Sequence, residues 1–218
     1  YGEVAYFGVG RSTTVFVTEQ DTGARLTTNG LPESMFLPHG ERAGRFPIAR
    51  WLSLLPLAAR PETKSLLVVG LGAGLTVEDV PPSVDTISVV ELEPEVVHAN
   101  RLFAPRRDHD PLADPRVRMH LADARGALLL TQQRFEAIVS QPSHPWTVGA
   151  SQLFTREFFQ LVRGRLQPRG VFVQWIGLDF IDEPLLRSLL ATLHAVFPHV
   201  ELYQPVTSAL LFLASAEP

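Results

Sequence analysis

The sequence predicts an α/β fold, in which a mostly parallel β-sheet carries helices on both faces and a small β-hairpin region precedes it. Short apolar runs, such as residues 66–69 and 87–90, alternate with helix-length segments from residue 66 onward. This alternation is typical of sheets built from strand–helix–strand units. A glycine-rich turn follows the first apolar run at Gly70, Gly72 and Gly74, where such sheets bind ligands. We divide the chain into residues 1–44 and residues 45–218.

The composition excludes several classes of protein. The chain has 218 residues, of which 45% are hydrophobic, and a net charge of -4 with a pI of about 6.0. It therefore offers no basic field for nucleic acid, and we expect no nucleic-acid partner. Cysteine is absent, which excludes disulfides, thiol nucleophiles and Cys-ligated zinc. No apolar stretch approaches the roughly 18 residues of a membrane span, and we expect a cytoplasmic location.

The N-terminal residues predict a hairpin followed by a helix. Residues 12–18 are β-branched and aromatic, residues 20–23 form a turn, and residues 24–28 return as the partner strand. A lone hairpin is only marginally stable, so it must pack on the main body or on a second copy of the chain. Residues 45–60 predict a helix with Pro47 in its first turn and Pro56 ending or kinking it.

The remaining elements alternate. Strands are predicted at residues 66–69, 87–90, 117–121, 135–139, 171–175, 200–203 and 209–214, with the last two antiparallel to each other. Helices are predicted at residues 76–80, 94–101, 124–130, 154–166 and 183–197.

Two strand-end acids accompany the glycine turn. Glu91 ends the second apolar run, 17 positions after Gly74, near the spacing at which a carboxylate meets a ribose diol in dinucleotide-type folds. The alternative is a plain loop and a solvated acid. Asp123 either accepts from an adenine amine or caps the next helix, and both roles are compatible. With the neighbouring residues Leu92 and Ala124, these positions predict a Rossmann-like nucleoside-binding domain over residues 45–218.

The loop at residues 140–149 holds the other candidate residues. Ser140 could donate a hydrogen bond to a bound base, and His144 could serve as a general base near neutral pH. A lone loop histidine is more often a surface residue, and the G-x-S-x-G elbow of serine hydrolases is absent around Ser140 and Ser143. The other histidines lack the spacing of metal ligands, so we expect no metal site.

Several motifs occur in order along nearly the whole chain. They include V-V-G-L-G-A-G, V-V-E-L-E-P-E-V-V, D-P-R-V-R-M-H-L-A-D-A-R and L-F-T-R-E-F-F. With these motifs the chain resembles the spermidine/spermine synthase family of aminopropyltransferases. It is most similar to the bacterial branch whose domain follows a membrane region, where S-E-P-S-N-P-W stands in place of S-Q-P-S-H-P-W. The resemblance implies a class I methyltransferase-type fold, a decarboxylated S-adenosylmethionine ligand and a homodimer. Because Tyr1 is not Met, we expect a longer protein, tethered to the inner membrane if such a region precedes.

The sequence departs from the family at the amine-binding positions. The resemblance implies an Asp within the glycine turn, where this chain has Ala73. It implies D-[ST]-[ST]-D-P in the later loop, where this chain has Ser140 and His144 with one residue inserted. It also implies Tyr-His-Glu where Ile48, Ala49 and Arg50 stand. Each lost acid removes a charge-assisted hydrogen bond, worth roughly 1.5–3 kcal/mol.

Three functional hypotheses follow. The first is a transferase that uses an S-adenosyl-type nucleoside as co-substrate, has spermidine-synthase ancestry and acts on an altered small-molecule acceptor, such as an amine. The second is a non-catalytic nucleoside-binding module. The third is a methyltransferase that uses intact S-adenosylmethionine in place of the decarboxylated form. The loss of the acid at Ala73 favours the last two hypotheses over aminopropyl transfer.

Overall fold

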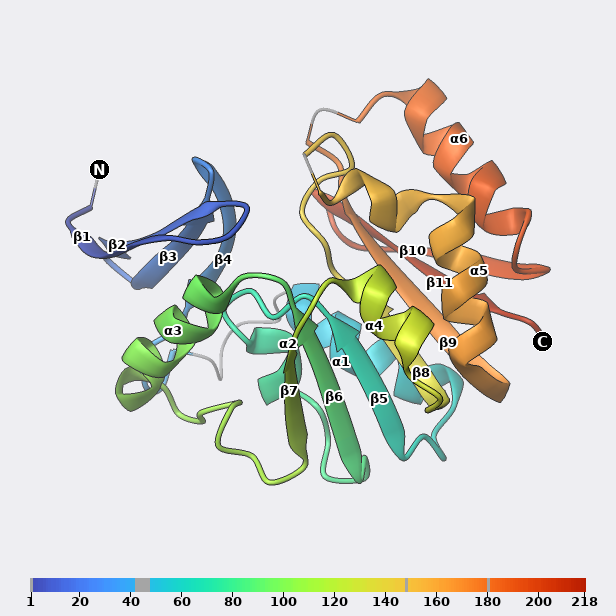
Figure 1. The fold of residues 1–218 in the computed structure, drawn as a ribbon, viewed down its shortest axis with the longest axis horizontal. Helices are drawn as coiled ribbons and strands as arrows, with labels where there is room; N and C mark the ends of the chain where they lie inside the picture. Colours follow the sequence, from blue (N-terminus) through green and yellow to red (C-terminus); the bar gives the residue numbers. More distant parts are fainter. Residues whose placement is uncertain (1, 42–47, 148, 180) are drawn as a thin grey trace.

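The computed structural model describes residues 2–41, 48–147, 149–179 and 181–218, and these residues form two sheets (Figure 1). The smaller sheet contains β1 (Val4–Val9), β2 (Thr14–Gln20), β3 (Gly23–Thr28) and β4 (Leu31–Phe36), each antiparallel to the next. The predicted hairpin corresponds to β2 and β3, whereas β1 and β4 were not predicted. Asn29 and Gly30 both adopt positive φ, at 48° and 83°, and so allow the two-residue turn between β3 and β4.

The larger sheet confirms the predicted α/β architecture. In spatial order it consists of β10 (His199–Val206), β11 (Ala209–Ser215), β9 (Leu166–Gly177), β8 (Phe135–Ser140), β5 (Ser65–Val69), β6 (Thr86–Glu91) and β7 (Val117–Leu121). The five strands from β9 to β7 are parallel to one another, and β11 is antiparallel to both of its neighbours. The carboxyl ends of the parallel strands therefore meet at one edge.

Helices cover both faces of this sheet. In Figure 1, α1 (Ile48–Ala59) and α2 (Leu75–Glu78) lie behind the sheet, whereas α4 (Ala124–Leu130), α5 (Arg156–Arg165) and α6 (Glu183–His194) lie in front. The strand residues alternate accordingly. Leu66 and Val68 of β5 pack with the core on the α1 side, while Leu67 and Val69 pack with the core on the α5 side. Such two-sided burial explains the continuous apolar runs of the sequence.

The N-terminal sheet is joined to the body through α3 (Pro94–Phe103) and the turn η1 (Ala104–Arg106). The Tyr6 hydroxyl of β1 donates a hydrogen bond to Glu95. The guanidinium of Arg106 forms a bidentate pair with Glu19 of β2, at 2.6 and 3.0 Å. These contacts hold the small sheet over the carboxyl-end edge of the large sheet.

Several predicted elements differ in extent from the structure: the helices predicted at 154–166 and 183–197 are Arg156–Arg165 and Glu183–His194, and the strand predicted at 171–175 is Leu166–Gly177. Within the described residues α1 runs past the buried Pro56 to Ala59. Proline removes only its own N–H, and Arg60 N still donates to Pro56 O at 2.8 Å, so the last turn closes. The helix predicted at residues 76–80 is the single turn α2, Leu75–Glu78. Pro47 and the boundary between residues 44 and 45 lie outside the described residues. Among the residues that the structure describes, no helix is long and apolar enough to cross a membrane.

Candidate functional site

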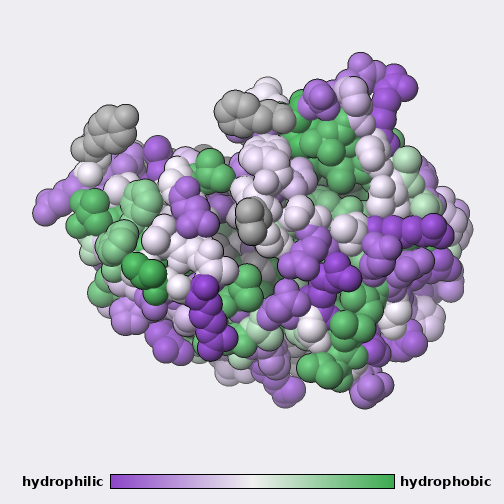
Figure 2. Space-filling view, turned by 45° about the horizontal axis from the view of Figure 1, so that its top comes forward, coloured by the Kyte–Doolittle hydropathy of each residue, from purple (hydrophilic) through white to green (hydrophobic). Residues whose placement is uncertain are grey.

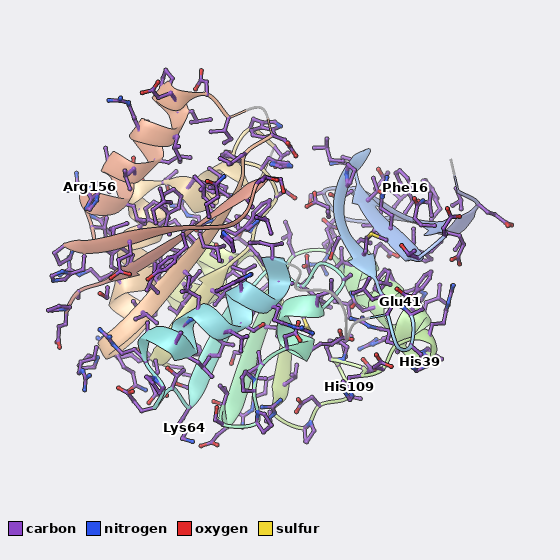
Figure 3. All side chains as sticks on the ribbon, turned by 180° about the vertical axis from the view of Figure 1, so that it is seen from behind. Phe16, His39, Glu41, Lys64, His109 and Arg156 are labelled. Atoms are coloured by element: carbon purple, nitrogen blue, oxygen red, sulfur yellow. The ribbon has the colours of Figure 1, made fainter. Side chains whose placement is uncertain are left out.

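A cleft of about 480 Å³ lies between the N-terminal sheet and the carboxyl-end edge of the large sheet. In Figure 2 it is the hollow between the lobe at the left and the larger body at the right. In Figure 3, Lys64 marks the amino end of β5, at the opposite edge of the sheet. The cleft therefore occupies the edge at which α/β sheets bind ligands. Its lining includes the predicted residues Gly70, Gly72, Glu91, Leu92, Asp123 and Ala124.

The glycine turn supplies backbone to the cleft. Gly70 has a φ of 90°, and a Cβ at this position would lie only 3.0 Å from the carbonyl oxygen of Gln141. Gly74 has a φ of 79°, and its Cβ would lie 2.7 Å from the ring of Pro111. Glycine is required at both positions by conformation and by space. Gly74 is buried and lies outside the lining, so its role is to shape the turn.

Glu91 ends β6 beside this turn. Its Oε2 accepts the backbone N–H of Leu71 at 2.8 Å, and its Oε1 accepts that of Glu93 at 2.9 Å. Desolvation raises the pKa of Glu91, and hydrogen bonds from the backbone N–H groups of Glu93, Leu71 and Leu92 oppose this shift. The carboxylate is thus held in one orientation, with its remaining lone pairs available to a diol. Each carboxylate oxygen can accept more than one hydrogen bond.

Asp123 confirms the capping alternative of the prediction. Its Oδ1 accepts the backbone N–H of Gly126 at 2.8 Å and so caps α4. The residue is exposed and lines the cleft together with Ala124. The position is compatible with a second bond to a ligand amine, which stays a prediction.

Ser140 and His144 lie outside the lining of the cleft. Ser140 is the last residue of β8 and is fully buried, with no hydrogen-bond partner for its hydroxyl among the described residues. The His144 ring stacks on Trp146 at a centroid distance of 4.3 Å and meets Trp175 at 5.8 Å. His144 is half-buried rather than a freely solvated surface residue. Their proposed chemistry stays a prediction.

Gln141 is the first residue of the loop after β8 and lines the cleft, but it was not among the predicted site residues. Its Oε1 accepts the hydroxyl of Thr76 at 2.7 Å, and its Nε2 donates to Gly70 O at 2.8 Å. Both ends of the amide are therefore bound to the segment that follows β5. The available signal was the motif S-E-P-S-N-P-W, because Gln141 stands at the position of its Glu.

Two more acids in the lining were also missed. Glu93 is buried and accepts the backbone N–H groups of Arg11 and Ser12 at 3.0 and 2.8 Å, which fixes the turn between β1 and β2. Glu33 of β4 accepts the hydroxyl of Ser143 at 2.5 Å across the cleft. The described lining thus contains four carboxylates, Glu33, Glu91, Glu93 and Asp123, and no Lys, Arg or His. Its charge favours a cationic ligand.

The structure also shows where the residues lie that differ from the family's amine-binding motifs. Ala73 is fully buried in the core and does not line the cleft. Ile48 and Ala49 line the cleft, whereas Arg50 directs its Nε to Asp79 at 3.3 Å. Within the described ranges no group of three His, Asp or Glu side chains is placed to hold a metal ion.

Comparisons with known proteins agree with this architecture. A putrescine N-methyltransferase of Nicotiana attenuata is 31% identical over 179 residues, covering 80% of this chain and 46% of its own length. A polyamine aminopropyltransferase of Nitrosomonas europaea is 30% identical over 168 residues, covering 74% and 51%. The chain therefore spans about half the length of these curated relatives.

Structural comparison gives the same fold. A spermidine synthase solved with the transition-state analogue AdoDATO superposes with a TM-score of 0.85 and 22% identity, covering 98% of this chain and 73% of that one. The sequence profile of the spermine/spermidine synthase domain matches residues 46–211. The chain therefore belongs to the spermine/spermidine synthase family.

Proposed function

We propose that the cleft binds an S-adenosyl-type nucleoside, namely S-adenosylmethionine, its decarboxylated form or methylthioadenosine. The observation that carries this proposal is the Glu91 carboxylate, held by two backbone N–H groups beside the glycine turn. A ribose diol is a suitable partner for a carboxylate in this position. Asp123 and Ala124 then lie where the base would extend along the edge. A spermidine synthase of the same fold was solved with AdoDATO, which supports the choice of ligand class.

We further propose alkyl transfer from one of the two sulfonium forms, S-adenosylmethionine or its decarboxylated form, to a small amine; methylthioadenosine has no sulfonium and is the product that aminopropyl transfer leaves. The neutral amine attacks a carbon bonded to the sulfonium, a C–N bond forms, and the C–S bond breaks. The electron pair of the broken bond returns to sulfur, which becomes a neutral thioether, and the amine releases one proton. The curated relatives are named for putrescine and polyamines, which supports an amine acceptor. The acidic lining is compatible with such a cation.

Methyl transfer is the second candidate. An aminopropyl donor carries an ammonium group, and Ala73 offers no carboxylate to hold it, because its side chain is apolar and buried. The methyl donor S-adenosylmethionine also carries an ammonium group, but its own carboxylate lies beside that group, so this donor depends less on an acid from the protein. The putrescine N-methyltransferase relatives show that members of this sequence neighbourhood are named for methyl transfer. Binding of a nucleoside without turnover would instead support a non-catalytic module.

Calorimetry separates these possibilities. Titration with S-adenosylmethionine, decarboxylated S-adenosylmethionine and methylthioadenosine should show saturable binding of at least one nucleoside. Incubation of each donor with putrescine, followed by mass spectrometry, then identifies a methylated or an aminopropylated product. If none of the three nucleosides binds, the proposal is wrong. If they bind but neither product forms, the transferase part is wrong for this acceptor.

A further inference from the structure

Among the four carboxylates that line the cleft, Glu33 differs from the others in its backbone setting. Glu33 lies in β4, where the pairing with β3 shifts register: Leu26 pairs with Ser34, and Thr27 pairs with Pro32. Glu33 is therefore the extra residue of a β-bulge. Bulges redirect a side chain and are frequent next to active sites. Here Glu33 and Ser34, which are consecutive residues, both line the cleft.

The bulge aims the carboxylate across the cleft. Its Oε1 accepts the hydroxyl of Thr28 at 2.6 Å and that of Ser143 at 2.5 Å. Ser143 belongs to the loop that follows β8, so one oxygen of Glu33 connects the N-terminal sheet to the body. No hydrogen bond from the described part of the chain reaches Oε2. An ionised carboxylate retains acceptor capacity at an oxygen so placed.

The other three acids of the lining each accept at least one backbone N–H group, whereas Glu33 accepts none within the described residues. Glu91 accepts two backbone N–H groups, and Asp123 caps α4. Glu93 accepts two backbone N–H groups and the hydroxyl of Ser12. In contrast, Glu33 accepts only two side-chain hydroxyls, both on one oxygen. Since the described lining contains no Lys, Arg or His, no basic side chain of that lining neutralises it.

We infer that Glu33 is the carboxylate that holds an ammonium group of the substrate, through Oε2. This inference rests on the proposed function, because it assigns one contact within the nucleoside-dependent site. The ammonium has two sources: the propyl arm of the donor nucleoside, or the acceptor diamine. The glycine turn of the body has Ala73 and supplies no negative charge. Glu33 supplies one from the N-terminal sheet. The chain could then bind the substrate's ammonium group although it lacks the family's acids at the amine-binding positions.

The test is calorimetry on Glu33→Gln in the full chain. The amide oxygen can still accept from Thr28 and Ser143, while the negative charge is lost. Three ligands are compared: methylthioadenosine, which has no ammonium; decarboxylated S-adenosylmethionine, which has one; and putrescine, titrated into protein saturated with methylthioadenosine. A charge-assisted hydrogen bond corresponds to roughly a 10- to 100-fold change in affinity.

We expect Glu33→Gln to bind methylthioadenosine like the wild type and to lose about 10- to 100-fold in affinity for at least one of the two ammonium ligands. The ligand that weakens identifies the source of the ammonium. Glu33→Asp keeps the charge and should retain part of the preference if the glutamine variant folds poorly. The matched control is Glu62→Gln, because Glu62 is exposed beside Arg169, outside the lining.

Three results would overturn the inference. In the first, Glu33→Gln binds all three ligands like the wild type. In the second, it loses affinity for methylthioadenosine as strongly as for the ammonium ligands. In the third, the wild type binds methylthioadenosine but neither ammonium ligand. In each of these results the wild type still binds a nucleoside, so the proposed function stands, whereas a wild type that binds no nucleoside refutes the proposed function and the inference together.

Discussion

Substitution of Glu91 by alanine tests the nucleoside site directly. The variant loses the acceptor for a ribose diol and also the bonds to Leu71 N and Glu93 N. A hydrogen bond to a charged group is worth roughly 1.5–3 kcal/mol, so we expect affinity for methylthioadenosine to fall by about that amount, or about 10- to 100-fold. Calorimetry at neutral pH measures the change. The ribose assignment is refuted if Glu91→Ala binds methylthioadenosine as tightly as the wild type.

The chain offers a matched control for the structural part of this loss. Glu136 of β8 accepts two backbone N–H groups, those of Lys64 and Ser65, at 2.6 and 2.8 Å. It makes these bonds at the amino end of the sheet, away from the cleft. Glu136→Ala should therefore lower the free energy of unfolding, by roughly 1–3 kcal/mol for the unpaired donors, and leave the affinity unchanged. An equal loss of affinity in both variants would mean that the effect of Glu91→Ala is structural.

Three further predictions follow from the same contacts. Because the pKa of Glu91 is raised, affinity for methylthioadenosine should weaken on acidification already above the ordinary carboxyl value of 4.5, and calorimetry showing constant affinity down to that pH would contradict this. Burial, together with the hydrogen bond to Glu95 and its charge, raises the pKa of Tyr6 from 10.0 to about 12, so the stability that this contact provides is complete below pH 10 and is lost as the pH rises through 12. Denaturant titrations at increasing pH should show that Tyr6→Phe does not lose this part of the free energy of unfolding. Phe7 and Val9 of β1 are 63% and 69% exposed, and we propose that they pack in a homodimer, which light scattering should detect at micromolar concentration; a monomer would contradict it.

Much of the fold could be predicted because local signals and tertiary packing agree. The strand at 117–121 and the helix at 124–130 match β7 and α4, since Asp123 provides a cap between an alternating run and an apolar helix. The outer strands of the N-terminal sheet lacked such signals. β4 contains Pro32 and the bulge at Glu33, both of which interrupt the period of two that identifies a strand.

Site residues could be predicted where they directly follow a clearly delimited strand. The prediction failed where it depended on the exact residue at which a strand ends. Glu91 and Asp123 were found because each follows a strand that is clearly delimited. The strand predicted at 135–139 extends in the structure to Ser140. This single residue moves Ser140 into the buried sheet and makes Gln141 the first residue of the loop. Glu33 meets Ser143 only through tertiary structure, across 110 positions of sequence.

The last prediction concerns aminopropyl transfer to putrescine, which we expect to be slow. The amines of putrescine have pKa values near the lysine reference of about 10.4, so the diamine is a dication at neutral pH. An enzyme must hold one end and take a proton from the other. Glu33 performs the first task if the ammonium that it holds is that of the acceptor, and a different group is needed for the second.

In the loop after β8, Ser140 and His144 lie outside the lining of the cleft, and Gln141, which does line it, has an amide with no basic form at neutral pH that is bonded at both ends to Thr76 and Gly70. General-base catalysis contributes typically 10²–10⁴-fold, which sets the expected deficit. The assay is putrescine-dependent release of methylthioadenosine from decarboxylated S-adenosylmethionine. Turnover of about 1 s⁻¹ or more lies in the ordinary range for enzymes and would show that another residue supplies the base. A parallel reaction with S-adenosylmethionine controls for methyl transfer, because this donor carries a carboxylate beside its own ammonium group and depends less on an acid from the protein.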